Sequence, residues 1–139
     1  MATAALYTPE ILALATSLAD YPWDSELPLQ GEARSKSCGS SLSLSLAIDD
    51  LGRIFRLGIK SQACAIGQSA AAIFASAAVG KNRAEIEEAL HAIDNWLAGK
   101  SEMPDWPCLD AIAAARDYPA RHPAIMLAWK AAADALPSC

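Results

Sequence analysis

The chain has 139 residues, a length typical of one domain that buries its own hydrophobic core. It is 53% hydrophobic and 19% charged, which predicts a folded protein and excludes a disordered one. The net charge is −5 and the basic residues are scattered, so nucleic-acid binding is not expected. No apolar run could span a bilayer and no secretory signal is recognisable, so we expect a cytoplasmic protein that does not bind membranes.

A helix is predicted near the start of the chain. Apolar residues recur at helical spacing from Pro9 to Ala19. Thr8 is a suitable N-cap, and proline is favoured in a first helical turn. A polar, proline-containing stretch follows, up to Gly31.

After this stretch the spacing of apolar residues changes, and they recur at every second position. Residues 41–48 alternate small or polar side chains with apolar ones, as in a half-buried strand, and 49–52 is a turn sequence. Residues 53–60 are predicted to return as the second strand. The side chains expected to share one face of it are Phe55, Leu57 and Ile59. A third strand is predicted over 29–34, because a two-stranded hairpin is marginally stable alone.

The remainder is predicted to be helical. An alanine-rich helix over 65–79 ends at Gly80, and Asn82 with Glu85 forms a capping-box variant before the next helix. The apolar stripe of that helix consists of Ile86, Leu90, Ile93 and Leu97. A loop with two prolines, a short helix over about 109–116 and a last helix from Pro123 to near Leu136 follow. We therefore predict a single α+β domain over 1–139, with helices on a small antiparallel sheet of about three strands.

Two of the four cysteines flank the predicted hairpin. Cys38 lies just before its first strand and Cys64 just after its second. Residues so placed face each other across the open end of an antiparallel hairpin, so the two thiols are expected to be neighbours. Lys36 favours the thiolate form of Cys38, and Cys64 precedes a helix whose first N–H groups are free.

Two adjacent thiolates suit zinc, copper(I) or an iron–sulfur centre. The alternative is that both cysteines are ordinary buried core residues, because cysteine is often buried without any chemistry. The spacing alone leaves both interpretations open.

Other candidate ligands are less favoured. His122, just before the last helix, could be a third ligand or a base for a thiol, although a capping or surface role is more common. Cys108 could be a ligand, but packing is favoured. His91 is expected to be structural, and the terminal Cys139 to be frayed. No glycine-rich phosphate loop is present, so nucleotide chemistry is not expected.

The chain resembles the iron–sulfur cluster assembly scaffolds, the group of IscU, SufU and the N-terminal part of NifU, from about Leu6 onward. The segments that carry the resemblance are Ser37–Ser40 before a strand, Cys64–Ser69 opening a helix, Gly80-Lys81 with the capped helix that follows, and the SufU-type ending Tyr118–Trp129. The resemblance implies a scaffold that holds zinc or a transient cluster through three cysteines and an aspartate. It also implies a cysteine desulfurase partner and recipient apo-proteins.

By this resemblance the first two family cysteines fall on Cys38 and Cys64. The aspartate position is occupied by Ser40, and the third cysteine position by Ala124. A zinc ion or cluster normally has four ligands, so losing a thiolate should weaken binding. His122 and Cys108 are the nearby substitutes to test.

Three hypotheses follow. The first is a non-enzymatic scaffold or carrier that binds a transient cluster or metal through Cys38 and Cys64. The second is a zinc-dependent relay that accepts persulfide sulfur from the desulfurase on one of these thiols. The third is a protein that keeps the fold and the docking surface and acts by interaction alone.

Overall fold

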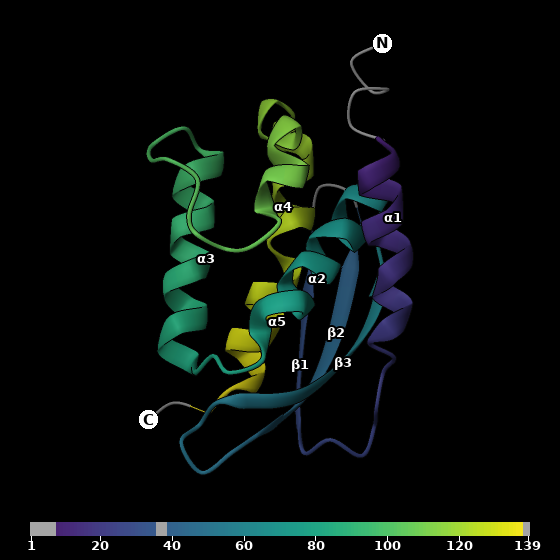
Figure 1. Cartoon of the computed structure of the whole chain (residues 1–139), viewed down its shortest axis with the longest axis vertical. Coiled ribbons are helices and arrows are strands. Elements are labelled where there is room, and N and C mark those ends of the chain that lie inside the picture. The colour runs from purple at the N-terminus through teal and green to yellow at the C-terminus, as the bar shows by residue number, and fades with distance from the viewer. Residues whose placement is uncertain (1–7, 36–38, 138–139) are drawn as a thin grey trace.

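The computed structural model of the protein describes residues 8–35 and 39–137 (Figure 1). A first helix is followed by three strands, and helices make up the rest, as predicted. The helices and 3-10 turns are α1 (Pro9–Ser17), η2 (Leu18–Asp20), α2 (Ala65–Ala78), α3 (Arg83–Leu97), η3 (Leu109–Asp117), η4 (Pro119–Arg121), α4 (His122–Ile125) and α5 (Leu127–Ala135). The strands are β1 (Leu29–Arg34), β2 (Ser41–Ile48) and β3 (Ile54–Gln62). Among the described residues, no helix is both long and apolar enough to cross a membrane.

The sheet is antiparallel with the order β1-β2-β3, so the predicted hairpin and third strand are confirmed. The turn between β2 and β3 is held by Asp49, whose side chain accepts hydrogen bonds from the N–H groups of Leu51 and Arg53. Gly52 has a φ of +76°, which only glycine adopts at little cost.

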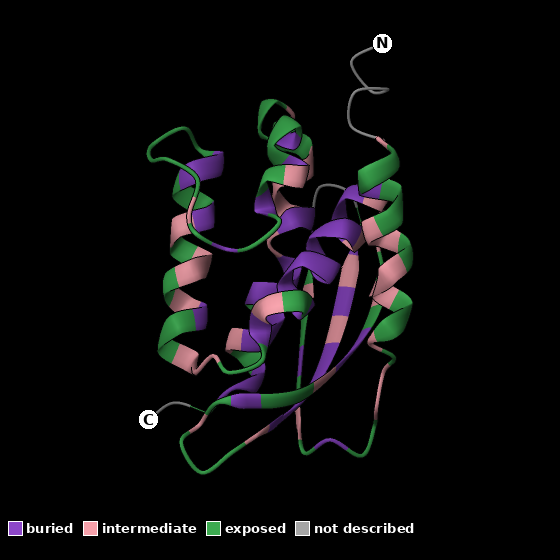
Figure 2. Cartoon of the chain, viewed as in Figure 1, coloured by how far each residue is buried: buried purple, intermediate pink, exposed green. Residues whose placement is uncertain are grey.

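One face of the sheet packs against the helices. On β2, leucines alternate with serines, and the leucines are buried beneath the helices: Leu42, Leu44 and Leu46. α5 lies directly on β1, where Gly31 permits close contact: a Cβ there would be 2.2 Å from the carbonyl oxygen of Ala131. Figure 2 shows that α2 is buried along most of its length between the sheet and the other helices.

Both predicted helix caps are present. The Thr8 side chain accepts a hydrogen bond from the N–H of Ile11 at 3.1 Å. Asn82 and Glu85 exchange hydrogen bonds in a complete capping box at the start of α3. These pairs satisfy N–H groups that a helix leaves without an internal partner.

One strand expectation is wrong. Phe55 is predicted to share a face with Leu57 and Ile59, but it is 51% exposed whereas Ile59 is buried, and Ile54 is buried in its place. The cause is an irregularity in pairing between Ala47 and Ile48, which leaves Phe55 as an extra residue on β3. Alternation cannot continue through such an insertion.

The C-terminal helices are less regular than expected. Residues 109–117 form a 3-10 segment with a kink at Ile112, in place of the predicted short α-helix. The predicted last helix is divided at Met126, where φ is −87° and ψ is −5°. This interruption separates α4 from α5.

Candidate functional site

The open end of the hairpin lies at one end of the sheet. Ser41 of β2 pairs with Gln62 of β3, and Cys64 follows two residues later. The N–H of Ser35 donates to the carbonyl oxygen of Ser40 at 2.8 Å, which joins the chain on either side of residues 36–39. Cys38 itself lies outside the described residues. The register nevertheless confirms that the chain segments flanking Cys38 reach the same end of the sheet as Cys64.

Cys64 is the N-cap residue of α2. Its side chain is half-buried and makes no capping hydrogen bond, and α2 has no acidic residue in its first turn. The N–H of Gln68 donates to the carbonyl oxygen of Cys64 at 2.9 Å, and its side-chain amide donates to that of Ala63 at 3.0 Å. The sulfur is therefore held at the positive end of a helix whose first N–H groups lack a side-chain acceptor.

Ala124, which the sequence resemblance aligns with the third family cysteine, lies beside the start of α2. A Cβ built on Gly67 would be 3.4 Å from the Cβ of Ala124. Gly67 is three residues after Cys64, hence within the first turn of α2. Ala124 is 1% exposed and offers no ligand atom. Ser40, at the aspartate position, is also buried and carries a hydroxyl in place of a carboxylate.

The other candidate ligands do not gather around Cys64. Within residues 8–35 and 39–137, no group of three or more His, Cys, Asp or Glu side chains could hold a metal ion. His122 contacts the carbonyl oxygen of Arg116 through Nε2 at 2.9 Å. Cys108 is exposed, with a φ of +67°, so the packed position favoured for it in the sequence is wrong. A ligand role for either residue stays a prediction. His91 is exposed on α3 rather than packed inside, and Cys139 lies outside the described residues.

Two residues near the site were missed in the sequence. A Cβ on Gly67 would be 2.8 Å from the Cβ of Ala63, so glycine allows the segment before α2 to pack closely, and the side chain of Gln68 hydrogen-bonds the same Ala63. A glycine inside an alanine-rich helix is a recognisable sign of close packing. The role of Gln68 depends on a contact across the helix start that no pattern encodes.

Comparison with solved structures places this arrangement in context. The N-terminal part of a nitrogen-fixing NifU-like protein from Brucella abortus superimposes with a TM-score of 0.86 and 26% identity, covering 97% of this chain and 94% of the other. The protein has the fold of the iron–sulfur cluster assembly scaffolds. A candidate iron–sulfur cluster assembly scaffold protein of the SUF system from Fervidobacterium islandicum AW-1 matches with a TM-score of 0.81 and 22% identity, over 96% of this chain and 98% of the other.

A third structure, of a hypothetical protein, shares the fold with a TM-score of 0.67 and 18% identity over 90% of this chain and 95% of the other. No protein-family model matches the sequence, and no curated protein matches it significantly. The scaffold fold is therefore established by the three-dimensional comparison, and the resemblance predicted from the sequence is confirmed at that level.

Proposed function

We propose that the protein is a scaffold or carrier that transiently binds an iron–sulfur cluster, or zinc, through Cys38 and Cys64. The observation that carries the proposal is the position of Cys64 on the scaffold fold. Cys64 is the uncapped N-cap of α2, at the end of the sheet where the segment with Cys38 joins β1 to β2. We further propose that residues 1–139 act as a single domain in the cytoplasm.

The position of Cys64 places it beside N–H groups that can bind an anionic ligand. A persulfide or a cluster sulfide there would accept hydrogen bonds from the first N–H groups of α2, which the Cys64 side chain does not cap, and would interact favourably with the helix dipole. Cys64 is half-buried and packs against the core, so it is neither sealed inside the protein nor fully exposed. This combination suits a ligand that must be acquired and released.

The described residues do not supply a complete ligand set. Ser40 and Ala124 stand where an aspartate and a cysteine are expected, and the described part of the chain gathers no third donor. We propose that the vacant coordination positions of the cargo are filled by His122 or Cys108 after rearrangement, or by a residue of the partner protein. Both routes predict weaker and more transient binding than a closed four-ligand site.

The main alternative is a protein that acts by interaction alone. The burial of Ala124 against Gly67 supports it, because this position contributes only packing. A persulfide relay with zinc is the second alternative, and the free N–H groups beside Cys64 support it. In all three cases we propose that a cysteine desulfurase is the partner that supplies sulfur or docks.

The deciding experiment is anaerobic incubation of the chain with a cysteine desulfurase, cysteine, ferrous iron and dithiothreitol, which reduces the persulfide sulfur to sulfide, followed by an apo-ferredoxin as recipient. The proposal predicts a coloured cluster on the chain that passes to the ferredoxin and is lost in Cys64→Ser. A colourless chain that carries zinc and a persulfide on Cys64 would instead identify a relay. Desulfurase binding without bound iron, zinc or persulfide would identify an interaction protein.

A further inference from the structure

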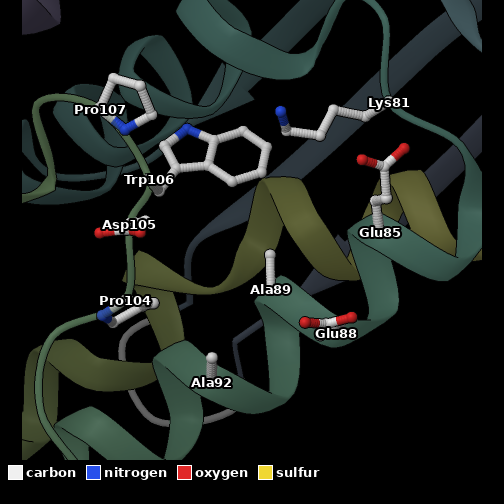
Figure 3. A pocket seen from close by; sticks show the side chains of 9 residues that line it. All are labelled: Lys81, Glu85, Glu88, Ala89, Ala92, Pro104, Asp105, Trp106 and Pro107. Carbon is white, nitrogen blue, oxygen red and sulfur yellow. The ribbon is translucent and has the colours of Figure 1, made fainter.

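A groove of about 310 Å³ lies between α3 and the loop that follows it (Figure 3). One wall is a single face of α3, since residues 85, 88, 89 and 92 follow helical spacing. The other wall is the segment 104–107. The α3 wall carries alanine at two positions, Ala89 and Ala92, and these small side chains leave the space open.

The base of the groove is rigid. The indole N–H of Trp106 donates to the carbonyl oxygen of Ile73 at 2.9 Å, and the ring stacks on Phe74 with centroids 5.7 Å apart. The ring of Trp129 packs edge-on against that of Trp106, with 5.3 Å between the ring centroids. Pro104 and Pro107 restrict the backbone on either side of Trp106. The groove is thus formed before any ligand arrives, which lowers the entropic cost of binding.

The charges along the groove are mostly negative. Lys81 places its ammonium 5.3 Å from the centre of the Trp106 ring, and Glu85 is engaged in the capping box of α3. Glu88 on α3 and Asp105 on the loop face the groove from opposite walls (Figure 3). Neither carboxylate forms a hydrogen bond or an ion pair with any residue the structure describes.

We propose that this groove docks a segment of a partner protein that inserts one arginine or lysine between Glu88 and Asp105. The charged head would meet the two carboxylates, and its aliphatic stem would lie on Ala89 and Ala92. Charge complementarity of this kind sets the specificity and the rate of association.

The exposure of the two carboxylates argues against a free small cation as the occupant. Glu88 and Asp105 are both exposed, so a small cation would keep most of its water and gain little. A side chain delivered by a polypeptide adds apolar contacts with the alanines and prolines of the walls.

The groove is also separate from the thiol site. Trp106 hydrogen-bonds the backbone of Ile73, in the second half of α2, and Lys81 lies beyond the end of that helix. Cys64 lies at the opposite end, at the start of α2. α2 has 14 residues and so spans about 20 Å. A partner could therefore occupy the groove while Cys64 remains accessible, and this inference does not depend on the proposed function.

The test uses the full chain and an array of pentapeptides with a central arginine or lysine flanked by alanine, leucine, valine or proline. A second array carries a central glutamate. The peptide that binds most strongly is then titrated into ¹⁵N-labelled protein. We expect shifts at Ala89, Ala92, Asp105 and the Trp106 indole N–H, and affinity that falls as salt is added.

The double variant Glu88→Gln/Asp105→Asn should weaken binding about tenfold, since it removes both attractive charges. The control is Asp94→Asn/Asp117→Asn, which removes two exposed carboxylates outside the groove and should leave the affinity unchanged. Equal weakening in both double variants, or no selection of basic over acidic peptides, would overturn the proposal. So would binding of N-acetylarginine amide as tightly as the best peptide.

Discussion

Gly67 of α2 and Ala124 of α4 lie opposite each other, with 3.4 Å between the Cβ of Ala124 and a Cβ built on Gly67. This arrangement brings the position of the missing family cysteine to the first turn of the helix that Cys64 begins. The alignment that assigns Ala124 to that position is therefore consistent with the packing. At this place Ala124 contributes a buried methyl group and no sulfur.

Ala124→Cys should increase the amount of iron or zinc bound per chain, because it adds a thiolate beside the start of α2. Metal content after anaerobic reconstitution, measured by elemental analysis, checks this. The matched control is Ala128→Cys, which places a thiol at an equally buried position about one helical turn further along the chain. Equal metal content in the Ala124→Cys variant and wild type would mean that position 124 is not a ligand position.

Cys38 and Cys64 should be close enough to be bridged by phenylarsine oxide, a reagent that links two neighbouring thiols. The physical reason is the pairing of Ser41 with Gln62, which brings both flanking segments to one end of the sheet. Mass spectrometry should find one bridged reagent per chain, lost in Cys38→Ser and in Cys64→Ser. The control Cys108→Ser should retain the bridge. A bridge that survives in Cys64→Ser would place the neighbouring thiol elsewhere.

Gly31→Ala should destabilise the fold by about 2 kcal/mol or more, because the new methyl group would overlap the backbone of α5. The nearest atom, the carbonyl oxygen of Ala131, lies 2.2 Å from the built Cβ and belongs to a buried helix. Urea unfolding measures the change. Gln30→Ala, an exposed change on the same strand, should stay within about 0.5 kcal/mol of wild type. Equal stabilities of the two variants would contradict the packing of α5 on β1.

Asn82→Ala should lower the free energy of unfolding by about 1 kcal/mol, because it removes the side-chain acceptor of the capping box. Thermal or urea unfolding checks the value. Asn95→Ala is a suitable comparison, since Asn95 is exposed in the last turns of the same helix and should change stability little. An equal loss in both variants would show that the cap at α3 contributes nothing of its own.

The hairpin could be predicted because its information is local. Alternating serine and leucine set the faces of β2, and the Asp49–Gly52 sequence set the turn. The placement of Cys64 beside the segment that carries Cys38 follows from those two features alone. Thr8 and Asn82 were likewise predictable, because a cap acts within three residues.

The features that could not be predicted from the sequence depend on contacts between distant parts of the chain. The insertion that exposes Phe55 changes no residue type, so alternation gave the wrong face. The proximity of Gly67 to Ala124 and the groove between α3 and Trp106 each join segments from different regions of the sequence. Local patterns carry no information about such pairs.

The most direct test of the proposed two-thiolate site is the iron, sulfide and zinc content of anaerobically purified and reconstituted protein, compared among wild type, Cys38→Ser, Cys64→Ser and Cys139→Ser. We predict that wild type carries the cluster or metal and that Cys38→Ser and Cys64→Ser each lose most of it. The Cys139→Ser control, which removes a cysteine with no proposed ligand role, should match wild type, and all four proteins should unfold cooperatively. Wild type that stays empty after reconstitution, or full content in both Cys38→Ser and Cys64→Ser, would contradict the proposed site.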